Sequence, residues 1–213
     1  MPNPRLLAVS LGLIALAGCK SDNMFDETGG LKITRSACPA LAVPAYTGDV
    51  TLFDPPSSRE ARAIDVVAQI TDLRGNCTEG DANLTTAATF QVQARRSNGS
   101  GARDVVLPYF ATVMRAGTVV VSKQVGQIRL HFNDGELRTT ATGQARADVS
   151  RAAATLPDEV ERKINRKRKA GDADAAIDPM SDPAIRAAVS RASFELLVGF
   201  QLTQDQLAYN ATR

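Results

Sequence analysis

The stretch LTTAATFQVQARR, residues 84–96, alternates apolar and polar side chains over most of its length. A period of two places successive side chains on opposite faces of a β-strand, so that one face is buried and the other meets water. The face predicted to be buried consists of Leu84, Thr86, Ala88, Phe90, Val92 and Ala94. The stretch therefore predicts a half-buried strand of an antiparallel sheet, and not a helix.

The same alternation recurs on both sides of this strand. The other predicted strands cover residues 49–53, 63–73, 104–114, 118–123, 128–132, 137–149 and 194–202. Gly126 predicts a bulge between two of them, and Pro108 predicts a strand edge or a bulge. Turn residues at 98–101 and 133–136 predict hairpin loops. About eight strands with short turns favour an antiparallel immunoglobulin-like β-sandwich, with a small closed barrel as the alternative.

Residues 150–192 break the strand pattern and predict a helical insertion. Pro157 suits the first turn of a helix, and Gly171 is expected to end it. Acidic residues come first in this helix, and six bases follow: Arg162, Lys163, Arg166, Lys167, Arg168 and Lys169. These bases form either a solvated helix face or a basic arm that binds an acidic partner, anionic lipid or lipopolysaccharide. A second helix is predicted over 183–192, capped by Ser181.

The composition limits the possible functions. The chain has 213 residues, a net charge of +2, one histidine and no tryptophan. The near-neutral balance disfavours a nucleic-acid binder. A Ser-His-Asp triad needs a histidine, and His131 alternates with the apolar Leu130 and Phe132, which predicts that it faces solvent. We therefore expect neither an enzyme nor a metal or cofactor site.

The N-terminus carries the most specific motif. Arg5 precedes an apolar run over residues 6–17, which is too short to span a bilayer and has the size of a secretory signal core. The sequence Leu16-Ala17-Gly18-Cys19 resembles the bacterial lipobox. The resemblance implies cleavage before Cys19, diacylglyceration of its thiol and acylation of the new amine. Lys20 follows the cysteine in place of Asp, which implies the outer membrane, facing the periplasm; the inner membrane and the cell surface remain open.

This motif sets the expected domain organisation. Residues 1–18 are expected to be the signal peptide, residues 19–30 a lipidated flexible tether, and residues 31–213 one domain. The two cysteines that remain, Cys38 and Cys77, are expected to pair, because an exported protein meets an oxidising compartment. The chain lacks a Cys-x-x-Cys motif, which favours a structural disulfide over a redox pair.

The tail of the chain, residues 194–210, resembles the ending of small uncharacterised proteobacterial envelope lipoproteins, a resemblance that implies no activity. The expected lipid anchor, the predicted β-sandwich and the lack of a catalytic constellation together predict a structural or assembly module. Such a module would bind a partner through exposed strand edges. A binder or carrier of an envelope lipid or glycan is the alternative. A hydrolase of envelope polymers is the third possibility, and it would need a cleft with clustered carboxylates.

Overall fold

The computed structural model describes residues 36–166, 171–173 and 177–212. The expected signal peptide, Cys19 and the tether lie outside these residues, as do three of the predicted basic residues, Lys167, Arg168 and Lys169. The chain divides into two units, and one of them, residues 35–164 and 177–213, holds all the described strands.

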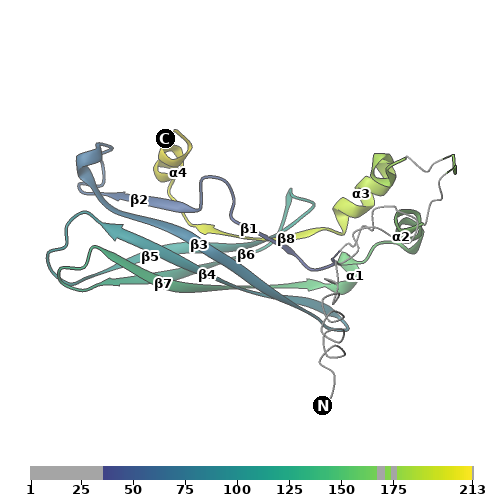
Figure 1. Ribbon diagram of the computed structural model, residues 1–213, viewed down its shortest axis with the longest axis horizontal. Helices are drawn as coiled ribbons and strands as arrows, with labels where there is room; N and C mark the ends of the chain where they lie inside the picture. The colour runs from purple at the N-terminus through teal and green to yellow at the C-terminus, as the bar shows by residue number, and fades with distance from the viewer. Residues whose placement is uncertain (1–35, 167–170, 174–176, 213) are drawn as a thin grey trace, which may run out of the picture. The chain divides into compact units, whose positions relative to one another are not determined.

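This strand-containing unit is mainly β and consists of two four-stranded sheets (Figure 1). One sheet has the order β1-β8-β5-β6 and the other β2-β3-β4-β7. The strands are β1 (Ala40–Ala42), β2 (Asp49–Phe53), β3 (Ile64–Glu79), β4 (Asn83–Arg96), β5 (Arg103–Arg115), β6 (Val119–Phe132), β7 (Arg138–Ser150) and β8 (Phe194–Phe200). All neighbours pair antiparallel except β1, which runs parallel to β8. The prediction of a mainly antiparallel β protein is confirmed.

The predicted buried face of β4 forms part of the core. Its six residues are each at most 6% exposed. The inner face of the other sheet contributes the side chains that pack into the same cluster, chiefly Leu130, Phe132, Leu196, Val198 and Phe200. The period-two pattern therefore predicted correctly which side of these strands is removed from water.

The prediction of hairpins at residues 98–101 and 133–136 is wrong. The first loop leads from β4 to β5 and the second from β6 to β7, and in each case the two strands belong to different sheets. The hairpins lie elsewhere, between β3 and β4 and between β5 and β6. Turn residues specify that the chain reverses, but they do not specify whether the next strand pairs with the last one or crosses to the facing sheet.

The predicted bulge at Gly126 is also wrong. β6 is one continuous strand, and Gly126 pairs regularly with Tyr109 of β5. Gly126 leaves room for the Tyr109 ring, which lies where a Cβ atom would stand. The tyrosine hydroxyl then donates to the carbonyl oxygen of Gln144 in β7 at 2.7 Å, which ties the two sheets together. The register shift in this pair of strands falls instead beside Val113.

Pro108 lies where the second pairing of β5 ends. The β5–β8 ladder runs up to the pair Tyr109–Phe200, and β5 continues beyond it beside β6 alone. On the β8 side the Pro108 carbonyl still accepts from the N–H of Gln201, the residue after β8, at 2.9 Å. Pro108 thus lies on an inner strand, where the ladder with β8 ends, and the predicted strand edge or bulge is not found there.

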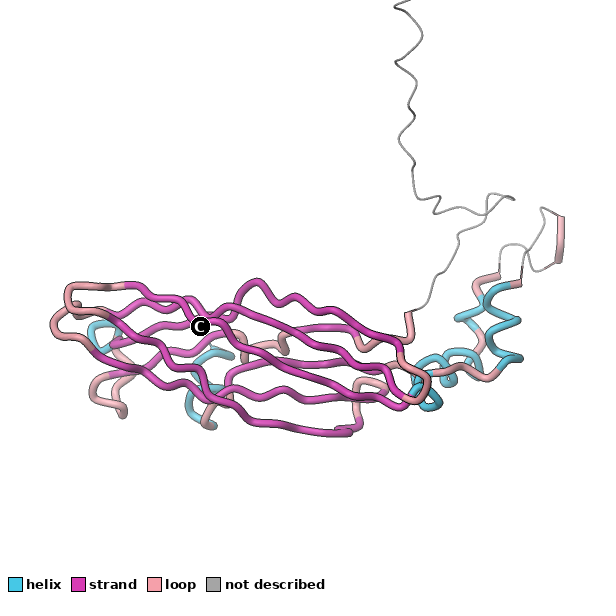
Figure 2. The backbone as a smooth tube through the Cα atoms, turned by 90° about the horizontal axis from the view of Figure 1, so that it is seen from below, coloured by secondary structure: helices cyan, strands magenta, loops and turns pink. Residues whose placement is uncertain are grey.

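The β7–β8 connection carries the predicted helical insertion. Its helices are α1 (Arg151–Ala154), α2 (Asp158–Asn165), the 3₁₀ turn η2 (Pro179–Ser181) and α3 (Pro183–Arg191). Figure 2 shows these helices beyond one end of the strands. Because α2 ends at Asn165, Gly171 does not close it; like charges four residues apart in the basic run destabilise a longer helix. The cap of α3 is Asp182 and not Ser181, since the Asp182 carboxylate accepts from the N–H of Ala184 at 2.8 Å.

The C-terminal helix α4 (Gln204–Thr212) begins with a capping box. The Thr203 hydroxyl accepts from the N–H of Gln206, and the Gln206 side chain accepts from the N–H of Thr203. At the other end of α4, the buried Asn210 donates to the carbonyl oxygens of Tyr46 and Asp49, both at 2.8 Å. These bonds hold the helix against the loop before β2.

Gly143 of β7 gives a test of the packing between the sheets. A Cβ atom there would lie 2.2 Å from the Phe90 ring and 2.8 Å from Ile128. The Phe90 ring cannot withdraw easily, because it is buried and packs edge-on against Tyr109 with centroids 5.1 Å apart. We expect Gly143→Ala to lower the free energy of unfolding by about 1–3 kcal/mol, measured by urea denaturation.

The control for this prediction is the double variant with Phe90→Leu. A smaller side chain at position 90 makes room for the new methyl group, so the added cost of Gly143→Ala should fall well below its cost in the native background. Equal costs in the two backgrounds would show that Phe90 is not what excludes a side chain at position 143.

Candidate functional site

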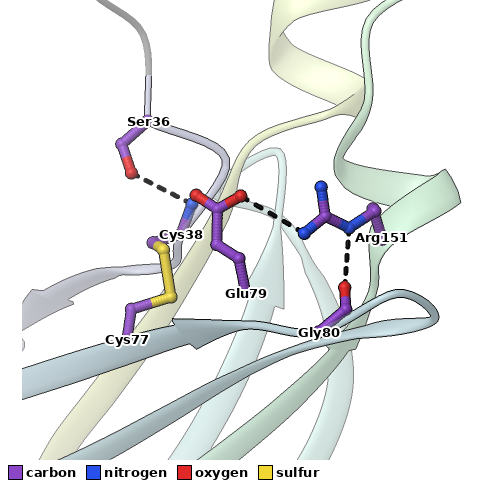
Figure 3. Close-up of a disulfide and its surroundings, with 6 residues drawn as sticks. All are labelled: Ser36, Cys38, Cys77, Glu79, Gly80 and Arg151. Atoms are coloured by element: carbon purple, nitrogen blue, oxygen red, sulfur yellow. Dashed lines mark hydrogen bonds and ion pairs between the residues drawn. A yellow bond between two sulfur atoms is a disulfide. The ribbon is translucent and has the colours of Figure 1, made fainter.

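A disulfide joins the two sheets at the end where the described chain begins. Cys38 and Cys77 are bonded, as predicted (Figure 3). Cys38 stands just before β1 of one sheet, and Cys77 belongs to β3 of the other. Arg151, at the start of α1, donates to the carbonyl oxygen of Gly80 at 2.7 Å and pairs with Glu79 at 3.3 Å. These contacts hold the β3–β4 hairpin, the first described residues and the start of the insertion together at one end of the two sheets.

The basic residues that the structure describes lie on α2 or just after it. Arg162 and Lys163 lie in the last turn of α2, Arg166 follows the helix, and all three are exposed. An exposed run of charge does not define a binding site by itself. The described basic residues therefore form a charged surface of the helical insertion, and on their own they do not establish a binding site.

The open edge of β6 is a second candidate surface. β6 ends the sheet β1-β8-β5-β6, so no described strand pairs with its outer side. We define the β6 edge as residues 122–132, over which the pairing with β5 is regular. It contains Lys123, Arg129 and His131, no acidic residue and no proline, and Val125 within it is 60% exposed.

A small charged cluster lies on the outer face of β5 and β6. Nδ1 of His131 lies 2.7 Å from one carboxylate oxygen of Asp104, and the Arg129 guanidinium donates to the other at 3.0 Å. The hydrogen bond that His131 donates to the Asp104 carboxylate raises the pKa of His131, and the bonds that this carboxylate accepts from His131 and Arg129 lower the pKa of Asp104. The histidine is exposed, as its alternation with Leu130 and Phe132 predicted.

The titration of His131 is directly testable, because it is the only histidine of the chain. We expect Asp104→Asn to lower the pKa of His131 toward its ordinary value. NMR of the imidazole protons over a pH series measures this pKa. Since folding raises this pKa, the stabilisation from the pair is complete below the ordinary pKa and is lost as the pH rises through the folded one. Asp205→Asn, far away on α4, should leave the His131 titration unchanged; an equal shift in both variants would contradict the assignment to Asp104.

Sequence reasoning missed two features of this surface. It predicted strands over 118–123 and 128–132 but could not tell that they form one strand at a sheet edge, because order within a sheet is a tertiary property. It also missed Arg96, whose buried side chain lies beside the loops of both the β4–β5 and the β6–β7 connections. A signal for Arg96 was present, since this charged residue falls on the apolar phase of residues 84–96.

Neither a metal site nor a spanning helix is found among the described residues. They contain no group of three or more His, Cys, Asp or Glu side chains that could hold an ion. None of the described helices has the length and hydropathy needed to cross a bilayer. The fold and surfaces thus define a mainly β protein of two largely antiparallel sheets with a helical insertion. No protein-family model, curated protein or solved structure matches the chain.

Proposed function

We propose that this protein is a lipid-anchored envelope protein that acts as an assembly module, and that its β6 edge takes up an extended segment of an envelope partner. In this proposal Cys19 carries the acyl chains, and the outer membrane, on its periplasmic side, is the location. The Cys38–Cys77 disulfide supports export, because such bonds persist in oxidising compartments. The two largely antiparallel sheets, with connections that cross between them, support an immunoglobulin-like sandwich as the scaffold.

The observation that carries the proposal is the open β6 edge. An edge strand presents a row of unpaired N–H and C=O groups, and a second chain can add a strand to it. The regular pairing with β5 over residues 122–132 keeps this row straight, and exposed Val125 offers an apolar contact beside it. The other edge strands are less suitable, since β1 has three residues, β2 has five, and β7 mixes acidic and basic side chains.

The charge of the β6 edge indicates the kind of partner. Two cations and His131, without an acid on the same strand, disfavour pairing of β6 with a second β6, which would bring like charges together. An acidic partner segment would instead be attracted to this strand, which carries no acid of its own. In this proposal the exposed Arg162 and Lys163 of α2 add to the attraction of an acidic partner.

The backbone at Gln127 faces the open edge. Gln127 pairs with Pro108 of β5. The Pro108 carbonyl points to the side of β5 that faces away from β6, where it accepts from the N–H of Gln201 at 2.9 Å. Residues directly opposite in an antiparallel pair point their peptide groups either toward each other or both away. The N–H and C=O of Gln127 therefore point away from β5, toward the position of an added strand.

A photo-crosslinking amino acid at Gln127 tests the proposal in the lipidated protein in its native envelope. We expect one envelope protein to be captured in near-stoichiometric amount. The matched control is the same substitution at Gln93, an exposed position on the central strand β4, which should capture nothing. Equal capture at both positions, or no captured protein at Gln127, would overturn the proposed role of the edge.

A backbone variant tests whether the capture depends on strand addition. Gln127→Pro removes an N–H that faces the open edge and leaves the β5–β6 hydrogen bonds in place. We expect it to abolish co-purification of the captured protein, whereas Gln127→Ala retains it. Thermal unfolding of both variants shows whether the sandwich persists; if proline unfolds it, the crosslinking comparison with Gln93 still decides the question.

A further inference from the structure

The turn between β5 and β6 exposes a short apolar run. Ala116 and Gly117 form the turn, with φ values of 57° and 69°, and the N–H of Thr118 donates to the carbonyl of Arg115. Positive φ at both central residues favours a tight hairpin turn, and Arg115 pairs with Val119 across it. The next residues, Val119, Val120 and Val121, are 46%, 58% and 51% exposed. We call these three residues the valine tip.

The valine tip is unusual for a strand of this protein. Elsewhere an apolar residue on a strand usually alternates with a polar one and is buried, as on β4. At the tip three consecutive valines are exposed, so that both faces of the strand present apolar side chains to solvent. A register shift beside Val121 separates the tip from the β6 edge, so a strand added along that edge would not cover it.

Cations flank the valine tip on both strands of the hairpin. Arg115 precedes the turn and is exposed, and Lys123 follows the valines and lies over the Phe110 ring, 5.4 Å from its centroid. No acidic residue occurs from Arg115 to Phe132. An apolar tip between basic residues suits the interface of an anionic membrane, where the apolar groups enter the headgroup region and the cations stay at the phosphates.

The valine tip lies at the same end of its sheet as the first described residues, which precede β1. The N–H of Ala116 donates to the carbonyl of Ser193 at 3.0 Å, and Arg115 pairs with Phe194 at the start of β8. In the same sheet Ala40 of β1 pairs with Glu195, so Cys38 lies at this end too. Two strands, β8 and β5, lie between β1 and β6, so the three spacings of ~4.8 Å separate β1 from β6 by roughly 14 Å.

The length of chain before the sandwich allows contact with the membrane. Residues 20–35 separate Cys19 from the first described residue, and a chain of that length spans at most about 55 Å when fully extended. An acyl group on Cys19 would therefore hold the first described residues within that distance of the bilayer, and the valine tip, which lies at the same end of the sheet, can reach it.

We propose that the valine tip inserts into the interface of the anionic membrane to which the protein is anchored, and so fixes the sandwich with its helical end toward the bilayer. This inference rests on the lipid anchor of the proposed function. Beyond Lys123, which stays at the lipid phosphates, the β6 edge is directed away from the lipid and open to a partner. A protein partner or a second copy of the chain at the tip is the alternative occupant.

Tryptophan is the natural reporter, because the chain has none. Val120→Trp places a single tryptophan at the valine tip of the full lipidated protein. Leu137→Trp is the matched control: Leu137 is 50% exposed and lies at the opposite end of the strands, before β7. Both variants are reconstituted on vesicles of phosphatidylcholine and phosphatidylglycerol, with and without bromine on the acyl chains, which quenches tryptophan at short range.

We expect the emission of Val120→Trp to shift to shorter wavelength on vesicles and to lose intensity with the brominated lipid. The emission of Leu137→Trp should do neither. Equal quenching of the two variants, or none for Val120→Trp, would overturn the inference. A blue shift that depends on protein concentration, without lipid quenching, would also overturn it, and would assign the valine tip to contact between copies of the chain.

Flotation of the same samples separates the two proposals. Protein that floats with the vesicles but leaves Val120→Trp unquenched retains the anchor and refutes membrane insertion of the tip. Protein that does not float after purification from the native envelope refutes the lipid anchor itself. Tm values of both tryptophan variants close to that of the native protein confirm that the sandwich is intact.

Discussion

Arg96→Met is expected to lower the free energy of unfolding by about 3 kcal/mol or more, because it removes four hydrogen bonds from a charged, buried donor. Arg96 is only 4% exposed, yet no carboxylate pairs with it in the described structure. Its guanidinium donates instead to four carbonyl oxygens, at 2.7–2.8 Å, those of Gly99, Gly101, Asn133 and Glu136. Methionine keeps the apolar stem of the side chain and leaves all four carbonyls without this donor.

The geometry explains why the loss should be large. Two of the carbonyls belong to the β4–β5 connection and two to the β6–β7 connection, so one side chain fixes both loops that cross between the sheets. The guanidinium also stacks over Phe132, 5.2 Å from the ring centroid. Water can reach the loops in the variant and restores part of the lost bonding, which is why the expected cost is below the sum of four such bonds.

The neighbouring arginine is the matched control. Arg95 is on the opposite face of β4 and is exposed. Arg95→Met should change the free energy of unfolding by less than about 0.5 kcal/mol. Chemical denaturation of both variants measures the difference, and similar costs at positions 95 and 96 would contradict the role given to Arg96.

Loss of the disulfide is expected to cost about 2–5 kcal/mol. Cys38 and Cys77 are separated by 39 residues, so their bond closes a long loop and removes many conformations of the unfolded chain. The bond also fixes the start of the described chain, including the three-residue strand β1, to β3. We therefore expect Cys38→Ala/Cys77→Ala to lower Tm substantially and β1 to exchange its amide hydrogens faster.

Reduction provides the control for this prediction. The native protein should lose stability when a reductant is added, and the double alanine variant should not respond to the reductant at all. A variant as stable as the oxidised native protein would show that the other contacts of the two sheets, and not the disulfide, hold Cys38 and β1 in place.

The class of fold and much of the core could be predicted from local sequence patterns. A period of two requires no tertiary information, so residues 84–96 and 194–202 revealed which side chains are buried. The helical insertion over residues 150–192 could also be predicted, because its residues follow a helical period and carry helix-capping side chains. The Cys38–Cys77 disulfide could be predicted from the number of cysteines, since only these two remain once Cys19 is expected to carry the lipid.

The order of the strands, in contrast, is a property of the folded molecule. The turns at 98–101 and 133–136 carry strong local signals, yet both lead from one sheet to the other, because pairing depends on which strands lie side by side and not on the turn alone. The same limit applies to Gly126, where the Tyr109 ring from another strand, and not a local bulge, requires glycine.

Both candidate surfaces depend on this order as well. The β6 edge is open because β6 comes last in its sheet, and the valine tip lies near the entry of the chain because β1 and β8 run parallel. Side-chain periodicity is a property of neighbouring residues, and a sequence displays it directly. An edge, an end or a shared face is a relation between segments far apart in the chain, which exists only once the core has brought them together.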